Sequence, residues 1–134
     1  MPLISLASNS TTAIKARYWR VKFGANIISH QPRMARIVLE EPDGTQTNVQ
    51  VFTSDNTSDS GTIPSNGSTY NYDGGSANAK GFSKMLFYST FTGGDRSGEY
   101  MVLWSHDNTN FVMGWGGVCQ SYSAGGLVYG TNSI

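Results

Sequence analysis

The stretch Ala16–Phe23, ARYWRVKF, alternates apolar and polar side chains. Successive side chains of a β-strand point to opposite faces of a sheet. One face of this strand carries the apolar residues Trp19, Val21 and Phe23. The other face carries the amphipathic residues Tyr18, Arg20 and Lys22. Long side chains of this second kind cover apolar area with their stems and keep their polar ends in water. The pattern therefore predicts a half-buried strand with a dry face and a wet face.

Strand and turn patterns recur along the chain, and no helical periodicity of useful length appears. The apolar run Ile37–Leu39 precedes the turn sequence Pro42-Asp43-Gly44, and an alternating run follows at 46–51, which predicts a hairpin. Further strands are expected in 82–91 and 100–115, and one or two short ones in 117–130. The 100–115 stretch reads as a hairpin with residues 106–110 at its tip. About eight antiparallel strands with short turns predict an all-β protein, a β-sandwich or jelly roll.

The domain organisation is expected to be simple. A chain of 134 residues is long enough for one domain with a sizeable core, here spanning 1–134. Residues 1–12 are expected to form an N-terminal arm. Residues 53–81 contain few aliphatic side chains and are expected to form a long loop, a feature that is usually functional or mobile in a compact domain.

Composition excludes several classes of protein. Charged residues make up 13% of the chain, against about 25% in an average globular protein, and the formal net charge is zero. A nucleic-acid binder needs a basic field, so nucleic acid is not an expected partner. The single cysteine, Cys119, excludes an internal disulfide and is expected to be a small buried hydrophobe. No apolar run is long enough for a signal peptide or a membrane span, so a membrane is not expected either.

Three stretches together resemble discoidin-like domains, also called coagulation factor type C or galactose-binding-like modules. Ala16–Phe23 is similar to the opening strand of these domains, Tyr70–Gly75 to their Asp-Gly turn, and Met101–Val112 to a later strand-turn-strand unit. The matching residues are Asp73, Gly74, Ser105, Asp107 and Asn110. Where the family has Gly and Trp, this chain has Asn108 and Phe111. The resemblance implies a discoidin-like jelly-roll sandwich, which often binds sugars through its loops and sometimes holds a structural calcium ion.

The sequence offers little for catalysis, and no enzyme activity is expected. The histidines His30 and His106 do not supply a zinc ligand set with Cys119. No Gly-x-Ser-x-Gly motif is present, and Ser105 and His106 are strand neighbours that would point apart. The segment Asp55–Gly61 has oxygen ligands at alternating positions but lacks the glycine and distal glutamate of an EF-hand loop. A solvated loop is therefore favoured over a calcium site, and neither metal nor cofactor is expected.

The composition of the chain, which is rich in Ser, Thr, Asn and Gly, resembles that of small phage virion proteins. The leading expectation is a non-enzymatic capsid decoration or cement protein, made in the host cytoplasm, homo-oligomeric and located in the virion with other capsid or tail proteins as partners. Expected contact residues are Pro2, Leu3, Ile4, Leu6, Tyr18, Arg20 and Lys22. The alternative is a carbohydrate-binding module for host-surface adhesion in a tail or fibre. Expected sugar-binding residues are Tyr70, Tyr72, Trp104, Trp115 and Tyr122. Core packing is the alternative for each tryptophan, and Trp115 is the first to test for exposure because the flanking glycines leave it room.

Overall fold

The computed structural model describes residues 14–26, 34–52, 66–76, 79–88, 96–121 and 127–128. Every regular element in these ranges is a β-strand, which confirms the all-β prediction. The strands are β1 (Tyr18–Asn26), β2 (Arg36–Glu40), β3 (Gln46–Val51), β4 (Thr69–Asp73), β5 (Lys84–Tyr88), β6 (Arg96–Ser105), β7 (Val112–Ser121) and β8 (Leu127–Val128). Seven strands have five or more residues, and β8 has two. No helix in the described ranges is long and apolar enough to cross a membrane.

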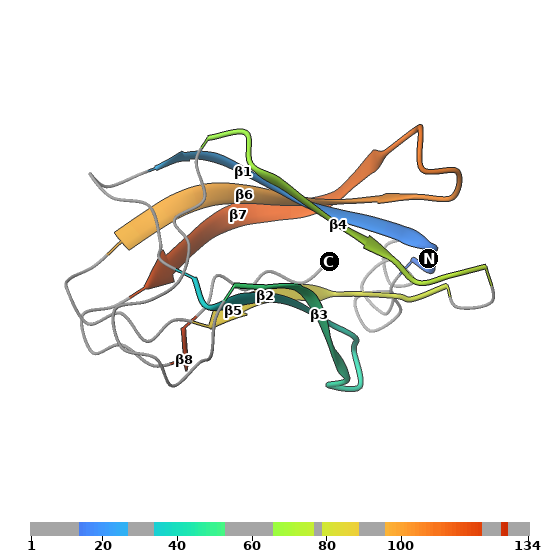
Figure 1. Cartoon of the computed structure of the whole chain (residues 1–134), viewed down its shortest axis with the longest axis horizontal. Coiled ribbons are helices and arrows are strands. Elements are labelled where there is room, and N and C mark those ends of the chain that lie inside the picture. The colour runs from blue at the N-terminus through green and yellow to red at the C-terminus, as the bar shows by residue number, and fades with distance from the viewer. Residues whose placement is uncertain are drawn as a thin grey trace, which may run out of the picture.

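The strands form two stacked antiparallel sheets, so the predicted β-sandwich is confirmed (Figure 1). One sheet has the order β4-β1-β6-β7, and the other has the order β3-β2-β5-β8. Only β2–β3 and β6–β7 are consecutive strands paired within one sheet, and every other connection leads to the opposite sheet. This repeated crossing brings β1 and β4 together, although some forty residues separate them.

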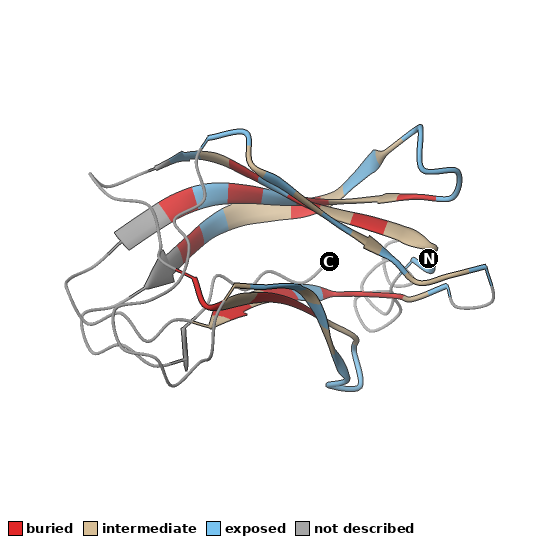
Figure 2. Ribbon diagram, in the orientation of Figure 1, coloured by how far each residue is buried: buried red, intermediate tan, exposed pale blue. Residues whose placement is uncertain are grey.

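The core lies between the two sheets and contains the dry face of β1. Trp19 and Val21 are fully buried and Phe23 is 3% exposed, which confirms the predicted faces of this strand. Figure 2 shows buried residues on both sheets and exposed residues at the two hairpin tips. The core residues are Ala16, Trp19, Val21, Phe23, Met34, Ile37, Leu39, Phe82, Met85, Phe87, Tyr100, Val102, Trp115 and Cys119. The prediction that Cys119 is buried is therefore also confirmed.

The β2–β3 hairpin forms where the Pro-Asp-Gly sequence predicts it. Gly44 has a φ of 93°, a left-handed conformation that a residue without Cβ adopts at little cost. Its amide donates to the carbonyl oxygen of Glu41 at 2.9 Å, and the amide of Thr45 donates to the Asp43 carboxylate at 2.9 Å. These bonds close the turn and fix the register that starts with Glu40 opposite Gln46.

The region 53–81, expected to be one long loop, contains the strand β4 (Thr69–Asp73). The loop prediction is wrong for these residues because β4 is an edge strand with Thr, Asn and Asp on its outer face. Its two tyrosines pack against the core from the inner face, and so replace the aliphatic residues on which the sequence interpretation relied. Residues 53–65 and the expected N-terminal arm 1–12 lie outside the described residues.

Candidate functional site

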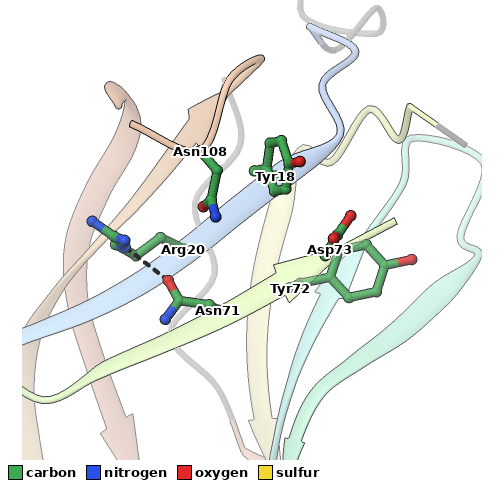
Figure 3. A pocket seen from close by; sticks show the side chains of 6 residues that line it. All are labelled: Tyr18, Arg20, Asn71, Tyr72, Asp73 and Asn108. Carbon is green, nitrogen blue, oxygen red and sulfur yellow. Dashed lines mark hydrogen bonds between the residues drawn. The ribbon is translucent and has the colours of Figure 1, made fainter. Parts of the chain in front are cut away.

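A polar pocket lies on the outer face of the β4-β1-β6-β7 sheet, near the tip of the β6–β7 hairpin (Figure 3). Its volume is about 290 Å³, close to the lower end of about 300 Å³ for ligand pockets. The lining residues are Tyr18, Arg20, Asn71, Tyr72, Asp73 and Asn108. They come from β1, β4 and the tip of the β6–β7 hairpin, three segments that only the tertiary fold brings together.

The pairing of β1 with β4 places four of these residues on one face. Tyr18 lies opposite Asp73, and Arg20 lies opposite Asn71. Directly opposed residues of an antiparallel pair project from the same side of the sheet. Because Trp19 and Val21 face the core, the alternation sends both of these opposed pairs to the outside. The polar pocket therefore follows from the burial of the apolar face of β1.

Asp73 at the end of β4 is paired with Arg17. The Arg17 guanidinium makes two hydrogen bonds to the carboxylate, from Nε to Oδ1 at 2.7 Å and from Nη2 to Oδ2 at 3.1 Å. The backbone amide of Gly75 also donates to Oδ1 of Asp73, at 2.8 Å. These donors lower the pKa of the Asp73 carboxyl, so it is ionised at neutral pH. The Arg17 guanidinium also lies 4.7 Å from the centre of the Tyr18 ring, which ties Tyr18 to the same group.

Arg20 in the middle of the pocket has different partners. Its Nε donates to Oδ1 of Asn71 at 2.8 Å, as the dashed line in Figure 3 shows. Its Cζ lies 3.8 Å from the centre of the Phe111 ring, a cation–π contact that holds the guanidinium plane. Because these contacts use the Nε edge and one face of the group, its two Nη atoms remain as hydrogen-bond donors.

Asn108 reaches the pocket from the tip of the β6–β7 hairpin, which the Asp107 carboxylate organises. Oδ1 of Asp107 accepts from the amides of Thr109 at 2.9 Å and Asn110 at 2.8 Å, and from the Ser105 hydroxyl at 2.8 Å. These hydrogen bonds lower the pKa of the Asp107 carboxyl far below its usual range. Asn108 itself has a φ of 60°, and its amide donates to Oγ of Ser105 at 3.0 Å. The tip therefore holds Asn108 in a defined, left-handed conformation.

The residues expected at partner contacts have separate locations. Tyr18 and Arg20 line the pocket, whereas exposed Lys22 lies further along β1 and lines a second hollow of about 210 Å³ with Glu99 and Met101. All three lie on the predicted wet face of β1, which the structure confirms as partly or fully exposed. The remaining expected contacts, Pro2, Leu3, Ile4 and Leu6, lie outside the described residues.

The residues expected to bind sugar do not gather into one site. Tyr72 lines the pocket, whereas the Tyr70 ring packs edge-on against the core ring of Phe23. Trp104 is partly buried against the core, and its ring meets the His106 ring at 5.1 Å. Tyr122 lies outside the described residues.

For Trp115 the core alternative is correct and the sugar-binding alternative is wrong, because the residue is 7% exposed and belongs to the core. Trp115 pairs with Val102 across β6 and β7, and both side chains face inward. Its indole packs at 6.2 Å from the ring of Trp19. The flanking glycines therefore do not open space around the indole, since strand register decides which way it points.

The sequence interpretation did not assign Asn71, Asp73 and Asn108 to a site. The Asp-Gly pair at 73–74 was visible only as a match to a turn, and it does end β4. The sequence signal that could have found Asn71 and Asp73 is the alternation of polar and aromatic residues in 69–73. Thr69, Asn71 and Asp73 mark the solvent-facing side of a strand, and Tyr70 and Tyr72 mark its inner side.

The pocket presents hydrogen-bonding side chains, those of Arg20, Asn71, Asp73 and Asn108. Ser105 and His106 have different partners, since the Ser105 hydroxyl donates to the Asp107 carboxylate and the His106 ring lies against Trp104. No three His, Cys, Asp or Glu side chains of the described ranges gather into a group that could hold a metal ion.

Comparisons of the chain with family models, curated proteins and solved structures return no match. The resemblance to discoidin-like domains stays a prediction.

Proposed function

We propose that this protein is a non-enzymatic carbohydrate-binding module that acts in adhesion, with the outer-face pocket as its sugar site. The observation that supports this proposal is the set of groups around the pocket. Arg20, Asn71 and Asn108 supply hydrogen-bonding groups, and Tyr18 supplies aromatic surface on the outer face of the sheet. Sugar hydroxyls need such closely spaced donors and acceptors, and the apolar face of a sugar ring needs an aromatic contact.

The site is preorganised, which favours binding of a small and strongly hydrated ligand. The side chain of Asn71 is fixed by Arg20, and the backbone of Asn108 is held by the hydrogen-bonded tip around Asp107. Side chains that are already ordered lose less conformational entropy when a ligand binds. A single sugar site of this kind binds weakly, so high avidity requires several copies that bind the same surface together.

The experiment that tests this proposal is a glycan-array screen followed by titration of the best glycan. Asn71→Ala removes a pocket amide and should reduce affinity about fivefold, because one neutral hydrogen bond is worth about 1 kcal/mol. Asn48→Ala is the matched control, because Asn48 is also an exposed strand residue that accepts from an arginine, Arg36, but on the opposite sheet. Absence of any glycan binding by the folded protein would refute the proposal.

A second candidate function, a capsid decoration or cement protein in a homo-oligomeric virion assembly, is favoured by a different surface. Met101, Met113 and Val118 of β6 and β7 are between 36% and 56% exposed. Apolar side chains of this size on neighbouring strands suit contact with another virion protein. Particles without this protein should then lose resistance to heat or low salt and still adsorb to hosts. Unchanged robustness with poor adsorption would favour the adhesion module instead.

A further inference from the structure

The further inference rests on the proposed function and concerns the charge of the sugar. Arg20 and Asp73 line the pocket, and Arg17 is the ion-pair partner of Asp73 beside it. Arg17 and Asp73 neutralise each other through two hydrogen bonds. Arg20 has neutral partners, the amide of Asn71 and the ring of Phe111, and forms no ion pair within the described part of the chain. The pocket therefore carries one positive charge without a matching carboxylate.

The orientation of Arg20 suits a carboxylate in the pocket. A guanidinium binds a carboxylate through two parallel N–H groups in its own plane. Asn71 takes the Nε edge, and Phe111 takes one face, so the plane is fixed before a ligand arrives. The Nη edge is the part left for two parallel hydrogen bonds, and Asn108, drawn between Arg20 and Tyr18 in Figure 3, lines the same pocket.

We propose that the pocket selects an acidic sugar, a uronic acid residue of a polysaccharide, over the corresponding neutral sugar. Arg20 receives the carboxylate of the sugar, and the amides of Asn71 and Asn108 receive its hydroxyl groups. Asp73 does not repel the acidic ligand strongly, because Arg17 cancels its charge at short range. Asn108 at the β6–β7 tip also lines the pocket, so the site contacts the sugar ring as well as its carboxylate.

The test compares two ligands that differ at one carbon. Methyl galacturonoside and methyl galactoside share every ring hydroxyl, and only the first carries a carboxylate in place of the terminal hydroxymethyl group. Both are titrated into isotopically labelled protein, and the amide signals of Asn71 and Asn108 are followed by NMR. The galacturonoside should bind about tenfold or more tightly, because a charge-assisted bidentate contact is worth at least about 1.4 kcal/mol, which is tenfold in affinity. Added salt should reduce this preference.

Variants of Arg20 separate charge from folding. Arg20→Gln should reduce the affinity for the galacturonoside to that for the galactoside, and Arg20→Lys should keep part of the preference because it keeps the charge without the planar fork. Arg36→Gln is the matched control, since Arg36 also combines an asparagine partner and an aromatic ring, at 3.6 Å from Tyr88. Lys22→Gln removes a charge from the same face outside the pocket. Both controls should leave the preference unchanged.

The outcomes separate this inference from the proposed function. Equal binding of the two sugars, or a preference that survives Arg20→Gln, overturns the inference and leaves the sugar site in place. Competition by acetate as strong as that by the galacturonoside also overturns the inference, because the site would then recognise a carboxylate without the sugar ring. No binding of either sugar or of any arrayed glycan refutes the proposed function itself.

Discussion

The indole nitrogen of Trp19 donates a hydrogen bond to the carbonyl oxygen of Lys80, 61 residues further along the chain, at 3.1 Å. The same carbonyl accepts from the amide of Ala16 at 2.9 Å, and Trp19 Nε1 also approaches the carbonyl of Ala16 at 3.1 Å. The start of β1 is thus fastened to the segment that leads into β5, on the opposite sheet. One tryptophan joins the two layers by a polar contact as well as by packing.

Removal of this side chain should be severely destabilising. Trp19 is fully buried, and its ring packs edge-on against Phe82 at 5.1 Å. Trp19→Ala should lower the free energy of unfolding by about 3–5 kcal/mol, since it leaves a large cavity. The carbonyls of Ala16 and Lys80 lose the indole donor but keep their backbone amide donors. Urea denaturation followed by circular dichroism measures the change. Lys22→Ala, on the exposed face of the same strand, should change stability by less than about 0.5 kcal/mol. Equal midpoints for the two variants would contradict the assigned faces.

The β2–β3 turn should depend on the absence of a side chain at Gly44. No atom lies within 4 Å of a Cβ built there, so Gly44→Ala meets no clash, and its whole cost comes from the φ of 93°. That cost is about 1–2 kcal/mol for an L-residue with Cβ. Gly44→Asn should recover much of the loss, because asparagine tolerates the left-handed region. Thermal unfolding of the three proteins checks this order, and an Ala variant as stable as the native protein would show that the turn has another conformation.

The β6–β7 tip should respond to the charge of Asp107. Asp107→Asn weakens the bonds accepted from Thr109 and Asn110, so amide exchange of these residues should become faster while the core strands stay protected. The pKa of Asp107 is lowered in the folded state, chiefly by the backbone amide of Asn110. Its contribution is therefore complete above the unfolded pKa of about 4 and disappears only as pH falls below that value. Loss of tip order between neutral pH and pH of about 5 would contradict this assignment.

The thiol of Cys119 should be inert in the native protein. Its side chain is fully buried, burial raises its pKa to about 12, and its Sγ donates to the carbonyl of Gly98 at 3.3 Å. A thiol-specific reagent at mildly alkaline pH should therefore modify the native protein only at the rate of unfolding, and modify the urea-denatured chain at once. The raised pKa also means that stability decreases as pH rises above about 8.5, where the unfolded thiol ionises. Rapid native labelling would place Cys119 outside the core.

Local patterns in the sequence determined the strands with strong alternation or clear turns. The two faces of β1 follow from Trp19 and Arg20 being neighbours of opposite polarity, and the β2–β3 hairpin follows from the glycine at position 44. Such features depend on residues close in the chain, so a period of two and a turn residue are sufficient to specify them. The all-β class follows from the same patterns repeated along the chain.

The tertiary structure alone decided the site. Tyr18 faces Asp73 because β1 pairs with a strand that begins more than forty residues after it ends, and Asn108 reaches them because β6 continues the same sheet on the other side. The sequence left the burial of Trp115 open for the same reason, since its direction is set by its pairing with Val102 and not by its neighbouring glycines. Periodicity tells which residues share a face, but the partner of each face is fixed by burial of the whole core, which couples residues far apart in the sequence.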